Sequence, residues 1–78
     1  MNINVSLDKR EFVEMKPKIK EIRLSKGLKQ TFVAAQLDMK QQQLSDWEAG
    51  RAYPRIDKAY KLAKVLGVNI EDLYEGEL

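Results

Sequence analysis

Residues 30–50 read QTFVAAQLDMKQQQLSDWEAG, and this stretch contains two short helical patterns in succession. The first covers residues 30–37 and carries its apolar side chains along one face. The second covers residues 41–49, where Leu44 and Trp47 stand three positions apart and predict an inward face. Only three residues separate the two predicted helices, so they must cross steeply rather than run antiparallel. The stretch therefore predicts a helix-turn-helix arrangement.

Three further helical patterns complete the predicted domain. One helix is expected over residues 17–26, another over residues 55–66, and a last one after Asn69, which is a good N-cap residue. No segment of this domain has a convincing strand pattern. We therefore expect an all-α, compact five-helix domain over residues 16–78, with residues 1–15 as an N-terminal extension.

The N-terminal extension alternates apolar and polar residues over positions 1–7, which is typical of an extended segment. So short a strand needs another strand or chain to pair with. Residues 8–15 instead predict one or two helical turns.

The composition excludes several classes of protein. The 78 residues suffice for one domain with one core, and 44% of them are hydrophobic. The chain has no cysteine and no histidine, which removes disulfides, thiolate metal sites and the commonest general base. No apolar run approaches the roughly 20 residues of a membrane span, and no signal peptide is recognised. These observations predict a cytoplasmic protein with no metal, no cofactor, no membrane association and no enzymatic activity.

Charge is distributed unevenly, although the net charge is only +2. Residues 16–30 carry six basic residues against one acidic residue, and residues 51–64 carry five against one. Residues 65–78 carry four acidic residues and no basic one. Two basic blocks beside an acidic tail are compatible with a polyanionic partner, although a lysine-rich helix face is more often simply solvated.

The second helix of the predicted pair leaves a polar face outside. Its two large apolar side chains point inward, so the candidate base-reading residues lie on the opposite side: Gln41, Gln42, Ser45 and Asp46. An exposed helix start presented to a groove is the docking geometry of a DNA recognition helix. A glutamine amide carries both an acceptor and a donor, so it can bond adenine N6 and N7 together in the major groove. Glutamine is also an ordinary surface helix former, and it is the helix-turn-helix setting that favours base reading.

Four segments together point to a known family. They are IKEIRLSKGLKQ at residues 19–30, FVAAQLDMKQQQLSDWEAG at residues 32–50, Pro54, and KLAKVLGVNIEDL at residues 61–73. Through these segments the sequence resembles the phage repressor and Cro-type helix-turn-helix proteins, also called the xenobiotic-response-element (XRE) family. The resemblance implies a lambda-repressor-like fold. It also implies a sequence-specific regulator of transcription, expected to be a repressor from a phage or mobile element.

The resemblance implies roles for individual residues. Gln41 and Gln42 match the first two base-reading positions, and Asp46 matches a further one. Gln30 matches a glutamine that bonds a phosphate and steadies the first base-reading residue. Contacts to the DNA backbone are expected from residues that flank the recognition helix or open the helix before it, namely Lys29, Gln30, Lys40, Gln43, Arg51 and Arg55.

Arg23 and Glu48 match a partly buried ion pair that ties the first helix of this family to the third. Removal of one partner would leave the other charge stranded, at a cost of a few kcal/mol. The resemblance therefore makes Arg23 a structural residue rather than a phosphate contact.

Three positions depart from the pattern of the family. Asp38 stands where glycine is usual, and aspartate tolerates the left-handed backbone region that such a turn needs. Lys29 stands at the N-cap of the helix that begins near residue 30, where Ser, Thr or Asn is better, and Thr31 is an alternative cap. Asp46 stands where several phage repressors have glutamine; its carboxylate could accept from cytosine N4 but would repel phosphate.

The sequence leaves open how the chain forms a dimer and whether it depends on a protein partner. The resemblance implies a homodimer on a double-stranded DNA operator, with Tyr74 and Leu78 as candidate interface residues. The alternating N-terminal segment offers a second route to a dimer, by strand pairing between chains. The alternative function is a helical protein-interaction module, or an antitoxin-like regulator that depends on a regulatory protein partner and binds DNA only weakly by itself.

Overall fold

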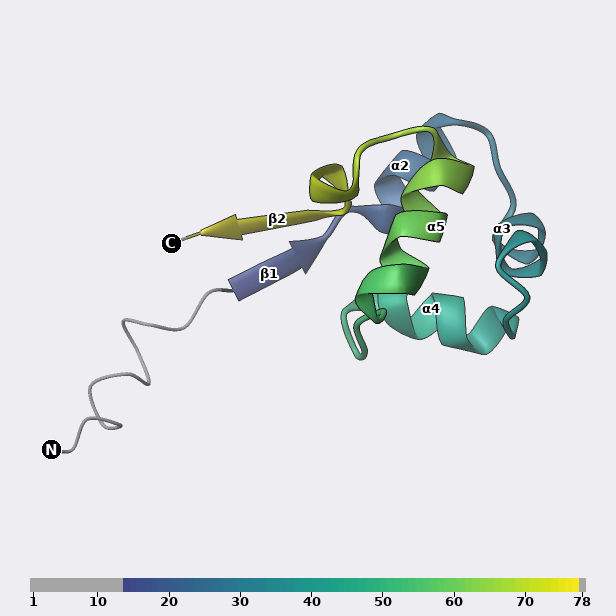
Figure 1. Ribbon diagram of the computed structural model, residues 1–78, viewed down its shortest axis with the longest axis horizontal. Helices are drawn as coiled ribbons and strands as arrows, with labels where there is room; N and C mark the ends of the chain where they lie inside the picture. The colour runs from purple at the N-terminus through teal and green to yellow at the C-terminus, as the bar shows by residue number, and fades with distance from the viewer. Residues whose placement is uncertain (1–13, 78) are drawn as a thin grey trace, which may run out of the picture.

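The computed structural model describes residues 14–77, which form a mostly helical domain with a small two-stranded sheet (Figure 1). Four α-helices follow one another, with bounds α2 Ile19–Ser25, α3 Gln30–Gln36, α4 Gln41–Ala49 and α5 Ile56–Leu66. A short 3₁₀ helix, η1, covers Ile70–Leu73. The strands are β1 Glu14–Pro17 and β2 Tyr74–Glu77. The expectations for residues 1–13 and for Leu78 lie outside the described residues.

The expected fifth α-helix is not present, because the chain after Asn69 makes only a single 3₁₀ turn, η1. The Asp72 carboxylate accepts a 2.9 Å hydrogen bond from the Asn69 N–H, which closes that turn. Tyr74 then adopts an extended conformation with φ −137° and ψ 148°, so the chain enters a strand instead of continuing the helix. The all-α prediction is corrected accordingly to four α-helices and a two-stranded sheet.

The sheet joins the two ends of the described chain. β1 and β2 are antiparallel, with Lys16 opposite Glu75 and Met15 opposite Gly76. The expected boundary at residue 16 therefore falls inside β1, and Met15 lies in a strand rather than in a helical turn. Figure 1 shows the two strands extending together away from the helices. At the inner end of the sheet, the Lys18 N–H donates a 2.7 Å hydrogen bond to the Leu73 carbonyl, which ties the strands to the helical part.

The core lies between the helices, and each helix contributes to it. The largest fully buried side chains are Ile19, Val33, Leu44, Leu62, Leu66 and Leu73. Each such side chain contributes about 1.5–3 kcal/mol relative to an exposed one. Trp47, the inward aromatic residue of α4, is only 4% exposed. The apolar faces predicted for α3 and α4 are therefore the ones that pack inward, which fixes the opposite face of α4 as the outer one.

The turn between α3 and α4 depends on the backbone of Asp38. This residue has φ +54°, so the expectation that it takes the left-handed region is confirmed. The Met39 N–H then donates to the Ala34 carbonyl at 3.0 Å, which closes the end of α3 against the turn. α3 begins at Gln30 with Lys29 at its N-cap and no side-chain cap, so the alternative start capped by Thr31 is wrong.

No helix between residues 14 and 77 has the length and apolar character needed to cross a lipid bilayer. The longest, α5, has 11 residues.

Candidate nucleic-acid interface

A buried ion pair anchors the inner side of α4. The Glu48 carboxylate accepts from Arg23 Nε at 2.6 Å and from a second guanidinium nitrogen at 3.2 Å. The side chains of Arg23 and Glu48 are only 8% and 4% exposed. Arg23 also donates to the Leu28 carbonyl at 2.9 Å, so each nitrogen of the buried guanidinium has a hydrogen-bond partner. The pair joins α2 to α4 and to the loop that precedes α3.

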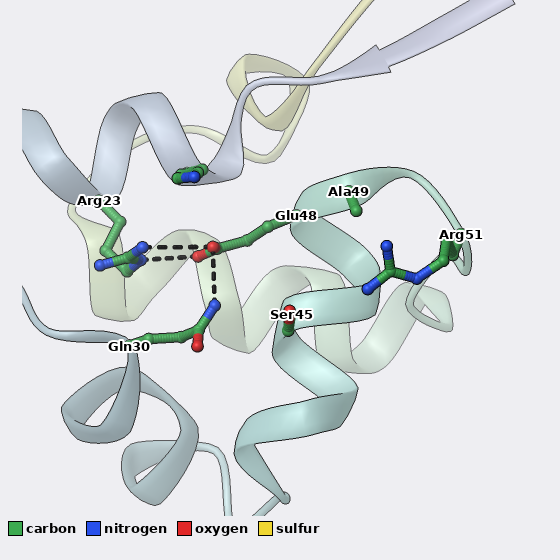
Figure 2. A pocket seen from close by; sticks show the side chains of 7 residues that line it. Arg23, Gln30, Ser45, Glu48, Ala49 and Arg51 are labelled. Atoms are coloured by element: carbon green, nitrogen blue, oxygen red, sulfur yellow. Dashed lines mark hydrogen bonds and ion pairs between the residues drawn. The ribbon is translucent and has the colours of Figure 1, made fainter.

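Gln30 extends this anchor toward the surface. Its Nε2 donates to Glu48 Oε1 at 2.9 Å, and Figure 2 shows Glu48 reaching between Arg23 and Gln30. An ionised carboxylate can only accept, so the amide of Gln30 must turn its nitrogen toward Glu48 and its oxygen away. That oxygen accepts a 2.9 Å hydrogen bond from Gln41 Nε2. The orientation of Gln41 is therefore set through Gln30 by a buried charge, and its amide oxygen and second N–H stay available.

Asp46 holds a second group of polar side chains on the outer face of α4. Its Oδ1 accepts from Gln42 Nε2 at 3.1 Å and from Arg51 Nε at 2.9 Å. A second guanidinium nitrogen of Arg51 lies 2.9 Å from the same oxygen. The carboxylate that departs from the family pattern is thus neutralised by a neighbouring arginine and bonded to one of the expected base-reading glutamines.

The remaining predicted residues are placed around these two groups. Gln41, Gln42 and Gln43 are exposed, whereas Ser45 and Asp46 are half-buried. Lys29 and Lys40 occupy the N-cap positions of α3 and α4. Arg55 precedes α5, and its Nε lies 3.6 Å from Asp57 Oδ1. Within residues 14–77, no side-chain hydrogen bond ties Gln43, Lys29 or Lys40 to the glutamines of α4.

An open hollow of about 350 Å³ lies beside this surface. Figure 2 shows Ser45 of α4 and Arg51, which lies just beyond α4, among the side chains that line it. Lys20 of α2 also lines it. Lys20 was not among the predicted contact residues. It precedes Arg23 by three positions and therefore shares its helix face, which is the signal that would have identified it.

A second, apolar hollow of about 240 Å³ lies where the sheet meets α5. Met15, Tyr53 and Ile56 line it and are 41%, 59% and 68% exposed. Tyr74, one of the two predicted interface residues, also lines it, and its ring centroid is 5.5 Å from that of Tyr53. The buried hydroxyl of Tyr74 has no hydrogen-bond partner among the described residues. Burial, assisted by the neighbouring Tyr53, raises the pKa of Tyr74 to about 12.

Comparison with known proteins identifies the family. A model of the helix-turn-helix family matches residues 19–73, which contain all four α-helices and η1. The chain belongs to the XRE-type helix-turn-helix family. The part of the chain that matches this family includes the whole candidate interface, from Lys20 to Arg55.

Several relatives within this family are named as regulators of transcription. The chain is 32% identical over 65 residues to the HTH-type transcriptional activator BcrR of Enterococcus faecalis. It is 37% identical over 60 residues to the uncharacterized HTH-type transcriptional regulator MJ0272 of Methanocaldococcus jannaschii. These alignments cover 83% and 77% of this chain. They span 32% of BcrR and 91% of MJ0272, so the chain corresponds to about a third of the first relative and to nearly all of the second.

The fold also matches that of a solved structure, a putative DNA-binding protein from Bacteroides fragilis. The TM-score is 0.75 at 24% sequence identity, and the match covers 80% of this chain and all of the other. This similarity shows that the two proteins share the same fold.

Proposed function

We propose that this protein is a sequence-specific double-stranded DNA-binding regulator of transcription that reads operator half-sites with α4 in the major groove. The observation that carries the proposal is the hydrogen-bonded chain from the buried Arg23–Glu48 pair through Gln30 to Gln41. It leaves the Gln41 amide with an outward acceptor and a donor, which is the pair that adenine N6 and N7 require. A preoriented amide loses less conformational entropy on binding than a free one.

Basic side chains stand at both ends of α4, where the phosphates on either side of a groove would lie. Lys40 occupies the N-cap of α4, and Arg51 follows Gly50 at its C-terminal end. Together with Lys29, Gln30, Gln43 and Arg55, these residues form the proposed set of backbone contacts. Such contacts fix the register of the recognition helix, and base contacts then supply the sequence preference.

We propose that the domain binds DNA as a homodimer, with the interface around the apolar hollow at Tyr74. Exposed Met15, Tyr53 and Ile56 surround that residue and form an apolar surface suited to a second copy of the chain. A twofold axis there would present two α4 helices to successive major grooves, about 34 Å apart. The paired domains would exclude other proteins from the base pairs that they cover, so we propose repression as the outcome.

Salt dependence of binding to a DNA duplex tests this function. Each neutralised phosphate contributes about −0.9 to the slope of log affinity against log salt concentration. Lys29, Lys40 and Arg55 together predict a slope of roughly −3 per protomer, because the charge of Arg51 is offset by Asp46. A slope near zero would contradict DNA binding and favour a module that binds another protein.

A further inference from the structure

The carboxylate of Asp46 connects two side chains that are proposed to have different roles on DNA. Its Oδ1 accepts from Gln42, one helical turn earlier, and from Arg51, just beyond the end of α4. We propose that Asp46 is a positioning residue that restrains Arg51 and thereby lowers the affinity for DNA of unselected sequence, while it orients Gln42 for base reading. This inference rests on the proposed function.

The end of α4 is built so that Arg51 returns to Asp46. Gly50 has φ +80°, a left-handed conformation that turns the chain back along the helix. The Arg51 N–H donates to the Asp46 carbonyl at 2.9 Å, which places the two residues side by side through the backbone. The guanidinium then meets the carboxylate through two nitrogens. The pairing therefore follows from the helix cap as well as from charge attraction.

The pairing changes what Arg51 can contribute to DNA binding. Its side chain is 60% exposed, so the guanidinium can reach a phosphate, but its charge is offset by Asp46. A neutralised arginine releases fewer counterions from DNA, and the adjacent carboxylate repels phosphates. Both effects weaken binding wherever base contacts do not compensate. Asp46 therefore favours discrimination over affinity.

The same carboxylate limits how Gln42 presents its amide. Because an ionised carboxylate only accepts, the Gln42 nitrogen must face Asp46. The amide oxygen and one N–H remain for a base edge, as they do for Gln41. Both glutamines are thus oriented by an acceptor within the protein, Gln41 by the oxygen of Gln30 and Gln42 by Asp46.

Binding to two duplexes tests the inference. One duplex is recovered with the wild-type protein from a randomised pool, and the other has a mixed sequence of the same length. The variants are Asp46→Asn, Arg51→Gln and the double variant. The control is Glu71→Gln on η1, which removes one negative charge, as Asp46→Asn does. The Asp46–Arg51 pair lies at the surface, with side chains 33% and 60% exposed, and such pairs contribute little to folding, so all variants are expected to remain folded, as circular dichroism can verify.

Asp46→Asn is expected to bind the mixed duplex several-fold more tightly, with a log–log salt slope steeper by about one. The affinity of this variant for the recovered duplex is expected to rise less. The ratio of its affinity for the recovered duplex to that for the mixed duplex therefore falls. Arg51→Gln changes the slope little in the wild-type background, but it removes the added slope in the Asp46→Asn background. Glu71→Gln leaves the slope unchanged, and Asp46→Glu, which keeps the charge, retains the wild-type slope.

Two results would overturn the inference while leaving the proposed function intact. One is an Asp46→Asn slope equal to that of the wild type on the mixed duplex. The other is an equal loss of slope from Arg51→Gln in both backgrounds, because Arg51 would then already act freely. If the wild-type protein shows no salt-dependent binding and no duplex is recovered, the proposed function itself fails and the inference fails with it.

Discussion

Arg23 and Glu48 lie 25 residues apart in the sequence, yet the Nε of one is 2.6 Å from the Oε2 of the other in the interior of the protein. Both side chains are almost fully buried. The same carboxylate accepts from Gln30, so the pair connects the core to the outer face of α4. The Glu48 carboxylate thus both pairs with Arg23 in the core and, through Gln30, orients the glutamine that is proposed to read a base.

Glu48→Ala should be strongly destabilising, because it leaves the Arg23 guanidinium buried without its carboxylate. The expected loss in the free energy of unfolding is about 3–5 kcal/mol. Urea unfolding followed by circular dichroism measures it. Glu71→Ala, at an exposed residue of η1, serves as the control and should change stability by less than about 0.5 kcal/mol. A loss below about 1 kcal/mol for Glu48→Ala would contradict the structural role of the pair.

Gln41→Ala should weaken binding to the preferred duplex by about 1–3 kcal/mol and relax the preference at one base pair of each half-site. Binding to a mixed-sequence duplex should change little, because the amide is proposed to read a base and not a phosphate. Fluorescence anisotropy with both duplexes measures the difference. Gln36→Ala, an exposed glutamine at the end of α3, should leave both affinities unchanged. Equal losses on the two duplexes would show that Gln41 does not read bases.

Ile56→Glu should convert the proposed dimer into a monomer. Ile56 is 68% exposed at the rim of the apolar hollow, so the substitution adds a charge to the interface without disturbing the core. Sedimentation velocity measures the mass in solution. Leu24→Glu provides the matched control, because Leu24 is 58% exposed on α2 and does not line that hollow. A dimer that survives Ile56→Glu would place the interface elsewhere.

Tyr74→Phe should remove a loss of stability at alkaline pH. The folded protein holds the pKa of Tyr74 at about 12, above its ordinary value of 10.0, because burial disfavours the phenolate. Between these values the unfolded chain binds fewer protons than the folded one, so the free energy of unfolding falls as pH rises. The stabilising contribution of the neutral phenol is complete below pH 10 and is lost toward pH 12.

Urea unfolding at pH 8 and pH 11 compares the wild type with Tyr74→Phe. At pH 8 the variant should not be destabilised, because the buried hydroxyl has no partner among residues 14–77. At pH 11 the variant should retain more of its stability than the wild type. Tyr60→Phe, at a residue that is 60% exposed, should behave like the wild type at both pH values. An alkaline loss as large in Tyr74→Phe as in the wild type would refute the assignment.

The helical part of the fold was predictable because its signals are local. The patterns over residues 30–37 and 41–49 correspond to α3 and α4, and the left-handed backbone at Asp38 follows from the short break between them. The sheet was not predictable in this way. EMKP and YEGE lack alternating β-branched residues, and their pairing joins the two opposite ends of the described chain.

In the candidate interface, too, local features were predictable from the sequence and most contacts between side chains were not. Helical periodicity was enough to place Gln41 and Gln42 on the outer face of α4. It did not reveal that Asp46 bonds Gln42 and Arg51, because this depends on side-chain conformations and on the turn at Gly50. The sequence identifies Tyr74 only as an apolar residue near the C-terminal end. That its hydroxyl is buried beside Tyr53 depends on the unpredicted sheet.

Selection of bound duplexes from a randomised pool at near-physiological salt would show whether α4 reads DNA sequence. We expect recovery of an inverted repeat whose half-sites lie about one helical turn apart, with adenines at matching positions in both halves. If no sequence is enriched while the protein is folded and dimeric in the same buffer, α4 does not read DNA sequence.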